Sequence, residues 1–191
     1  MTRLVLASTS PQRRAILEQL RIPFAVVAPT YVEHDARGLE AAELVRAHAV
    51  GKARSVRRDG LTLGVDTAVV VDGRVYGKPG DTREATRMLG ELAGRSHTVI
   101  SGLCLCGPGF DVVYDAETEV AFRSLSSSEV TQYVESDEWR GRAGGYAIQG
   151  LGGRLVERIE GDYLNVVGLP AALLIDVLTR HAPELLQARS L

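Results

Sequence analysis

The hydrophobic pattern of this chain alternates between continuous apolar runs and apolar stripes at helical spacing. The runs are rich in β-branched residues and have the length of buried strands, whereas the stripes follow one face of a helix. Strands are predicted over Leu4–Ala7, Phe24–Val27, Thr62–Val71, Thr98–Leu105, Val112–Phe122, Leu155–Ile159 and Tyr163–Val167. Helices are predicted to begin at Pro11 and to cover Glu40–Val56, Thr82–Leu92, Ser126–Val134 and Pro170–Arg180.

Two further segments supply turns. Asp72-Gly73 suits the tight turn of a hairpin over Val69–Tyr76. Glycine is frequent between Arg142 and Arg154, which indicates that the backbone turns tightly there or approaches another group closely. The alternation of strands and helices predicts an α/β protein in which helices flank a mixed β-sheet. The 191 residues suit one domain, or two small lobes that share a sheet.

The composition is that of a soluble globular protein, with 45% hydrophobic and 24% charged residues. The formal net charge of −2 gives no general attraction to nucleic acid, so no nucleic-acid binding is expected and any bound anion requires a few placed cations. No apolar run approaches the ~20 residues that span a bilayer, so we expect a cytoplasmic protein without a membrane segment. Cys104 and Cys106 are predicted to be reduced residues that face opposite sides of a strand and form no bridge.

The first predicted helix carries a cation on its apolar face. Its apolar stripe extends back at helical spacing to Arg13, in the first turn, whereas Arg14 falls on the solvated face. Ser8 and Ser10 precede the helix, and Ser10 suits its N-cap. Free backbone N–H groups, hydroxyls and a fork-shaped guanidinium together suit a phosphate group. The alternative is an arginine paired with an internal carboxylate beside a serine that only caps the helix.

The second predicted helix repeats this feature, because Lys52 falls on its apolar stripe. One interpretation is that the lysine reaches past the apolar residues to solvent. The other is that this helix, like the first, directs a cation inward. The agreement of two helices favours this second interpretation.

The third unusual position is Asp66, which interrupts a strand otherwise suited to full burial. An unpaired buried carboxylate is costly, so this side chain requires a cation: Lys52, Lys78 or bound Mg²⁺. A purely structural ion pair is the alternative. Glu33, in a polar loop, is a weaker candidate for a second metal carboxylate, and Lys78 is positioned to reach the same space.

An acid near several cations and a helix N-terminus suits hydrolysis of a phosphoanhydride. The cations and a metal screen the phosphates, and the carboxylate positions or deprotonates water. The chain has no G-x-x-x-x-G-K-[ST] motif, which excludes a P-loop enzyme, and no G-x-S-x-G elbow. Its glycines do not follow the dinucleotide fingerprint, and its four histidines lack metal-ligand spacing.

Five segments carry specific motifs. They are Leu6–Arg14 (LASTSPQRR), Gly64–Thr67 (GVDT), Gly77–Pro79 (GKP), Gly145–Gly150 (GYAIQG) and Gly161–Pro170 (GDYLNVVGLP). In this order they resemble the Maf family of nucleotide pyrophosphatases, and the resemblance covers the chain from Leu4 to about Leu178.

The resemblance implies one domain over residues 1–191, in which an elongated mixed sheet separates two lobes around a cleft, as in the wider inosine triphosphate pyrophosphatase superfamily. It implies that a nucleoside triphosphate is split into monophosphate and pyrophosphate by attack of water on the α-phosphorus, with Mg²⁺ or Mn²⁺. Asp66 matches the proton acceptor and, with Glu33, a metal ligand. The positions that match phosphate-, metal- or substrate-contacting residues are Ser8, Arg13, Glu33, Lys52 and Lys78.

Substrate choice in this family follows three positions, here Gln12, Thr67 and Gln149. The branch that acts on dTTP and UTP typically has arginine, threonine and glutamine there, and the 7-methyl-GTP branch has tryptophan, glutamine and glutamate. This chain agrees with the first branch at Thr67 and Gln149. It departs at Gln12, whose neutral amide still forms hydrogen bonds but lacks the arginine charge.

The resemblance therefore implies dTTP/UTP pyrophosphatase activity. A 7-methyl-GTP pyrophosphatase is the alternative within the class. A non-catalytic, nucleotide-binding regulator of septum formation is the alternative of another class, since family members have been linked to septum arrest. Asp66 favours an enzyme, because a pure binder gains nothing from a bare carboxylate beside a triphosphate. The resemblance also allows a homodimer, although no apolar stripe locates an interface.

Overall fold

A mixed β-sheet runs through the computed structural model, which describes residues 4–33, 39–56 and 59–187. In this part of the chain the sheet has seven strands, in the order β2-β1-β3-β5-β6-β7, with β4 paired to β3. They are β1 (Leu4–Ala7), β2 (Phe24–Val27), β3 (Leu61–Val71), β4 (Arg74–Tyr76), β5 (Ser96–Gly107), β6 (Phe110–Phe122) and β7 (Val156–Glu160). β1 is parallel to β2 and β3, and the remaining pairs are antiparallel.

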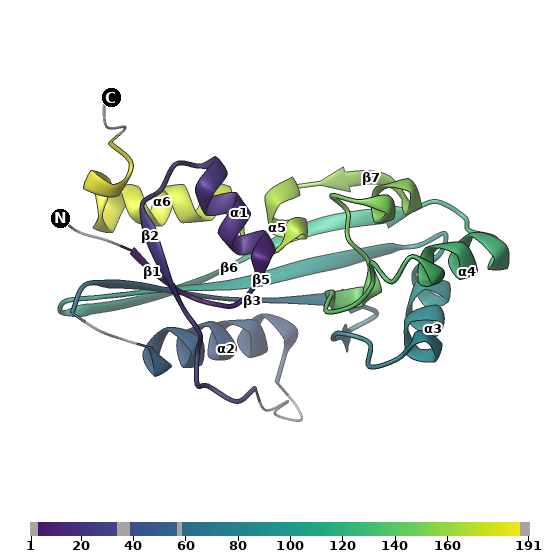
Figure 1. The fold of residues 1–191 in the computed structure, drawn as a ribbon, viewed down its shortest axis with the longest axis horizontal. Helices are drawn as coiled ribbons and strands as arrows, with labels where there is room; N and C mark the ends of the chain where they lie inside the picture. Colours follow the sequence, from purple (N-terminus) through teal and green to yellow (C-terminus); the bar gives the residue numbers. More distant parts are fainter. Residues whose placement is uncertain (1–3, 34–38, 57–58, 188–191) are drawn as a thin grey trace.

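Helices cover both faces of this elongated sheet (Figure 1). The α-helices are α1 (Pro11–Gln19), α2 (Ala41–Ser55), α3 (Thr82–Leu92), α4 (Ser127–Glu135), α5 (Tyr163–Val167) and α6 (Ala171–His181). Short 3₁₀ helices are η1 (Ala143–Gly145), η2 (Leu151–Leu155) and η3 (Pro183–Leu185). Figure 1 shows α2 on one face of the sheet and α1, α5 and α6 on the other. The predicted α/β class, a mixed sheet flanked by helices, is confirmed.

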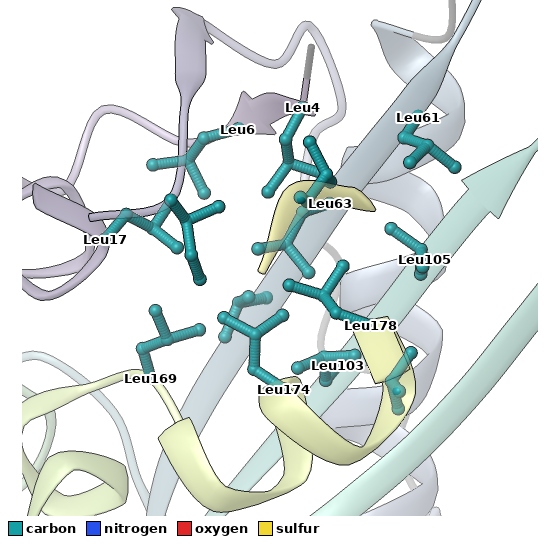
Figure 2. Packing of buried hydrophobic residues seen from close by; sticks show 14 of the residues in the cluster. Leu4, Leu6, Leu17, Leu61, Leu63, Leu103, Leu105, Leu169, Leu174 and Leu178 are labelled. Atoms are coloured by element: carbon teal, nitrogen blue, oxygen red, sulfur yellow. The ribbon is translucent and has the colours of Figure 1, made fainter. Parts of the chain in front are cut away.

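Two large hydrophobic clusters lie along the sheet. The first joins β1, α1 and α6 to the centre of the sheet, and Figure 2 shows its interlocking leucines. The second joins the other end of the sheet to α3 and α4. On β3, Val65 belongs to the first cluster and Val69 to the second, so that Asp66 and Thr67 fall between them. The polar residues of β3 therefore mark the junction of the two clusters.

The edge of β3 is open at this junction. Residues 61–63 of β3 pair with β1, and Val69–Val71 pair with β4. Between these two partners, the described residues place no strand against the edge that carries Asp66. Side chains from both faces of the sheet can therefore meet at one gap.

Segment Tyr163–Val167 is the helix α5, so its prediction as a strand is wrong. The Asp162 carboxylate accepts the backbone N–H of Leu164 at 2.8 Å and caps the helix, and Gly168, at φ 129°, ends it. Asn165 is fully buried, and its Nδ2 donates to the carbonyl of Val99 at 3.1 Å. Capping and a buried tertiary contact therefore outweigh the β-branched composition of the segment.

Cys104 and Cys106 face the same side of β5, which corrects their predicted opposite orientation. Their Sγ atoms lie 3.6 Å apart without a bond, and both pack against Ala49 and Ala53 of α2. The reason is geometrical, because alternate residues of a strand share a face. Within the described residues, no helix is long and apolar enough to cross a membrane.

Candidate active site

A cavity of about 680 Å³ opens at the gap beside β3. It is lined by the start of α1, the middle of β3, the loop after β4 and the glycine-rich segment before β7. All the residues singled out in the sequence line it: Ser8, Ser10, Gln12, Arg13, Glu33, Lys52, Asp66, Thr67, Lys78 and Gln149. The structure thus brings together side chains from segments that are far apart in the chain.

Arg13 is held by neutral oxygen atoms. Its Nε donates to the carbonyl of Gly168 at 2.9 Å, and its terminal nitrogens donate to Ser8 Oγ and Thr67 Oγ1 at 3.3 Å each. Burial lowers the pKa of this guanidinium from its usual value, and the charges of Asp66 and Glu33 oppose that shift. The inward orientation predicted for Arg13 is confirmed. Its contacts fix the side chain without neutralising its charge.

Ser10 caps α1, as predicted. Its Oγ accepts the backbone N–H of Arg13 at 3.4 Å and donates to Gln12 Oε1 at 3.1 Å. The backbone N–H of Ser10 in turn donates to Ser8 Oγ at 3.1 Å. These bonds order the first turn of α1 beside the cavity, and a phosphate contact by either serine stays a prediction.

Lys52 joins the two acidic side chains of the cavity. Its Nζ lies 2.6 Å from Glu33 Oε1 and 2.6 Å from Asp66 Oδ1. The lysine is only 7% exposed, so the interpretation in which it reaches solvent is wrong. A buried ammonium between two carboxylates leaves the cluster with one net negative charge.

Close contact between α2 and the sheet sets the height of Lys52 above β3. A Cβ added to Gly64 would lie 2.1 Å from the carbonyl oxygen of Ala49, and one added to Gly102 would lie 2.3 Å from that of Val45. Real Cβ atoms do not approach so closely, so only glycine allows the helix backbone to rest on β3 and β5 at this distance. This spacing lets the Lys52 side chain reach Asp66 directly.

The electrostatics of the cluster favour an ionised Glu33. Burial raises the pKa of this carboxyl, but its hydrogen bond to Lys52 and the charges of Lys52, Lys78 and His48 outweigh burial. The pKa of Glu33 therefore lies below its usual 4.5, and the side chain carries its charge at neutral pH.

The three predicted specificity positions differ in exposure. Thr67 is partly buried, and its Oγ1 lies 2.9 Å from Ser101 Oγ in addition to its contact with Arg13. Gln12 is half-buried on α1. Gln149 is exposed at the rim, in the glycine-rich segment. Thr67 thus shapes the floor of the cavity, whereas Gln149 is free to meet a ligand.

Sequence reasoning missed several residues that line the cavity: His48, Arg140, Arg142 and Tyr146. His48 is buried, and its Nδ1 lies 3.2 Å from Tyr31 Oη. Tyr146 Oη lies 2.8 Å from Nε2 of the buried His97. The glycine-rich pattern from Arg142 to Arg154 had marked the segment of Arg142 and Tyr146 as one of close approach, but it did not distinguish their side chains, and Arg140 lies outside it.

Glu33 and Asp66 suit a divalent cation of the Mg²⁺ type. Such an ion takes oxygen ligands, commonly one or two protein carboxylates together with substrate phosphates and water. Both carboxylates point at one cationic group, the ammonium of Lys52. Among the described residues, including this cavity, no group of three or more acidic, histidine or cysteine side chains is arranged to hold a metal, so substrate phosphates and water would have to complete the ligands of such an ion.

The fold and the cavity together define an α/β protein with a cleft that is lined by an acid pair and several cations. The family model described as "Maf-like protein" matches residues 3–181. The chain belongs to this family.

Curated relatives match the chain over almost its whole length. A protein of Symbiobacterium thermophilum is 47% identical over 183 residues, which are 94% of each chain. One of Alcanivorax borkumensis is 43% identical over 92% of this chain and 93% of its own. One of Moorella thermoacetica is 46% identical over 89% and 90%. Each of these proteins is named "dTTP/UTP pyrophosphatase".

A solved structure, that of the Staphylococcus aureus Ham1 protein, is a more distant match. It is 13% identical, with a TM-score of 0.45 over 63% of this chain and 72% of its own. The likeness is too low to carry an argument.

Proposed function

We propose that this protein hydrolyses dTTP and UTP to the nucleoside monophosphate and pyrophosphate. The observation that carries the proposal is the Glu33–Lys52–Asp66 cluster, with 2.6 Å contacts, inside a cavity that is also lined by the partly buried Arg13. The names of the relatives support the same reaction. In this scheme Asp66 accepts a proton from water, whose oxygen bonds to the α-phosphorus as the bond to the bridging oxygen breaks.

The cations would stabilise the leaving group. Pyrophosphate gains negative charge as the phosphoanhydride bond breaks, and Arg13 and Lys78 line the cavity with charges that no carboxylate contacts among the described residues. A divalent cation held by Glu33 and Asp66 would neutralise phosphate oxygens and lower the pKa of a bound water. The ordered first turn of α1, with Ser8 and Ser10, supports a phosphate group at the same place.

Base choice is proposed to depend on Gln149, Thr67 and Gln12. The edge of uracil or thymine presents an N–H between two carbonyl oxygens, and the Gln149 amide both donates and accepts. Thr67 fits the floor beside Arg13, where the longer glutamine of the 7-methyl-GTP branch would displace the guanidinium. The neutral Gln12 removes one positive charge relative to the typical dTTP/UTP branch.

The experiment is pyrophosphate release from a set of nucleotides: dTTP, UTP, CTP, 7-methyl-GTP and ITP. We expect dTTP and UTP to give the highest kcat/KM and pyrophosphate, rather than phosphate, as the product. Activity should stop with EDTA and return with Mg²⁺ or Mn²⁺. Fastest turnover of 7-methyl-GTP, release of phosphate, or full activity in chelator would each contradict the corresponding part of the proposal.

The variant Asp66→Asn separates catalysis from binding. It should lower kcat by at least about 10²-fold, as expected for loss of a general base. Affinity for a non-hydrolysable triphosphate should stay near wild type or improve, because a negative charge beside the phosphates is removed. A variant that keeps most of its rate would exclude Asp66 as the base, and a wild-type protein that binds but never turns over would favour the regulator of septum formation.

A further inference from the structure

Arg142 lines the cavity and has an unsatisfied donor, although its charge also acts on the hydroxyl of Tyr133. Its Nε is buried without a hydrogen bond, and no ion pair of its side chain occurs among the residues that the structure describes. Its neighbour Arg140 is different, since its guanidinium lies 2.9 Å from Asp137 and 4.5 Å from the ring of Trp139. The Nε itself is too buried to meet a ligand, but the terminal nitrogens of this partly buried guanidinium form no hydrogen bond or ion pair among the described residues, so they can donate to an acceptor bound in the cavity.

A backbone hydrogen bond joins the segment of Arg142 to the loop of a second cation, Lys78. The turn after Arg142 is fastened to the loop that carries Lys78, because the N–H of Gly144 donates to the carbonyl of Gly77 at 3.0 Å. Gly144, at φ 67°, also lies against Val69, where an added Cβ would be 2.9 Å from the side chain. Any bulkier residue would push this turn away from β3. Arg142 and Lys78 therefore line the cavity from two connected segments.

The charges that line the cavity indicate what kind of ligand it favours. Two carboxylates line it, Glu33 and Asp66, and both contact Lys52. The remaining cations of the lining are Arg13, Lys78, Arg140 and Arg142. The lining is thus positive although the whole chain has a net charge of −2, so the cavity favours a polyanion. A purely structural arginine would instead face one of the acids.

We propose that Arg142 is a further substrate-binding residue, which acts with Lys78 to hold the phosphate chain of the bound nucleotide. The inference rests on the proposed function, because it takes a nucleoside triphosphate as the ligand. A guanidinium presents a fork of N–H donors that matches two phosphate oxygens. Hydrogen bonds between such a cation and a phosphate are stronger than those between neutral groups. Arg142 thereby adds a phosphate contact from the segment beside the second hydrophobic cluster to the phosphate contacts proposed for α1.

The test compares Arg142→Gln with Arg142→Lys and a control, Arg154→Gln. Arg154 is exposed in the same segment and does not line the cavity, so its variant loses the same charge without losing a contact to the ligand. The probes are the α,β-methylene analogue of dTTP and inorganic tripolyphosphate, with Kd from calorimetry. KM and kcat for dTTP and the thermal midpoint are measured in parallel.

We expect Arg142→Gln to weaken both probes by about tenfold or more, from the loss of a charge-assisted hydrogen bond. Arg142→Lys should restore part of the affinity, and Arg154→Gln should bind as the wild type does. The thermal midpoint of Arg142→Gln should stay the same or rise, because no partner within the protein is lost. A structural arginine would give the opposite result, a lower midpoint with unchanged affinity in the folded fraction.

Wild-type Kd and kcat/KM in Arg142→Gln would overturn the inference while leaving the proposed function intact. The proposed function fails separately, if the wild type releases no pyrophosphate from any nucleotide. Arginine-dependent binding of tripolyphosphate would then still support Arg142 as a phosphate-binding residue, since that measurement needs no turnover.

Discussion

At the scale of single residues, the site depends on one buried ammonium between two carboxylates. Lys52 and Asp66 lie on elements that face each other, and Glu33 approaches from the loop after β2. Like charges at such separations repel strongly in a partly desolvated site, and the ammonium of Lys52 lowers the pKa of Glu33. Replacement of Lys52 should therefore change the protonation of Glu33 before it changes the fold.

Lys52→Met should raise the pKa of Glu33. Burial already raises this pKa in the wild type, and the lysine is the main cause of its net decrease below 4.5. A group whose folded pKa is lowered stabilises the protein above its unfolded pKa, and this contribution is lost as pH falls through the folded pKa. The wild type therefore keeps this contribution at pH values down to below 4.5. In the variant, burial should hold the folded pKa above the unfolded value, so ionised Glu33 should cost stability at neutral pH, and this cost should disappear as pH falls through the raised pKa.

The measurement is a carbon-detected NMR titration of the carboxyl groups, with Glu33→Gln to assign the signal. Lys78→Met is the matched comparison, because Lys78 is exposed and acts on Glu33 only through its charge. It should shift the same pKa by less. An unchanged titration of Glu33 in Lys52→Met would show that the cluster is not formed in solution.

At the scale of elements, the contact of α2 with the sheet determines where Lys52 lies. The two glycines under this helix, Gly64 and Gly102, come from neighbouring strands and leave no room for a methyl group. Helix and sheet are thus closer than ordinary side chains allow, and the site depends on that closeness.

Gly102→Ala should destabilise the protein by about 1–3 kcal/mol, as overpacking of a tight interface does. It should also lower activity, because α2 must move away from Asp66. The matched control is Gly90→Ala, since Gly90 lies in α3 with nothing near its missing Cβ. That change should stabilise the protein by about 0.5–1 kcal/mol. Urea unfolding measures both, and equal stability of Gly102→Ala and the wild type would contradict the close contact.

At the scale of the whole molecule, the cavity lies where the two hydrophobic clusters meet. Gln12 and Arg13 reach it from α1, beside the first cluster, and Arg142 and Gln149 reach it from the segment beside the second. A nucleotide bound there would touch both parts. We propose that the chain behaves as one domain of two lobes for this reason.

A bound nucleotide should therefore stabilise both ends of the sheet together. With Asp66→Asn and the α,β-methylene analogue of dTTP at 100 times its Kd, the free energy of unfolding should rise by about 2.7 kcal/mol. Hydrogen exchange should slow in α6 as well as in α3. Protection confined to one of these helices would show that the two clusters unfold independently.

Much of the fold and of the site could be predicted because burial of one face of a helix or strand produces a regular spacing of apolar residues along the sequence. The strands β1 and β2 and the helix α3 have the predicted bounds, since their apolar spacing directly reports which faces are covered. The same spacing identified three candidate site residues, because each carries a charge at a position where the pattern requires an apolar side chain: Arg13, Lys52 and Asp66. The family motifs then gave these residues their proposed roles.

Helical and strand periodicity depends only on neighbouring residues, so the sequence alone indicated that Arg13, Lys52 and Asp66 are turned inward, although it gave no such signal for Arg142. The tertiary structure decided which partner each of them meets. Arg13 donates to Gly168, 155 residues away, Lys52 lies between two acids rather than one, and Arg142 meets no carboxylate among the described residues. Contacts between distant segments depend on how whole elements pack, and no local pattern encodes that packing.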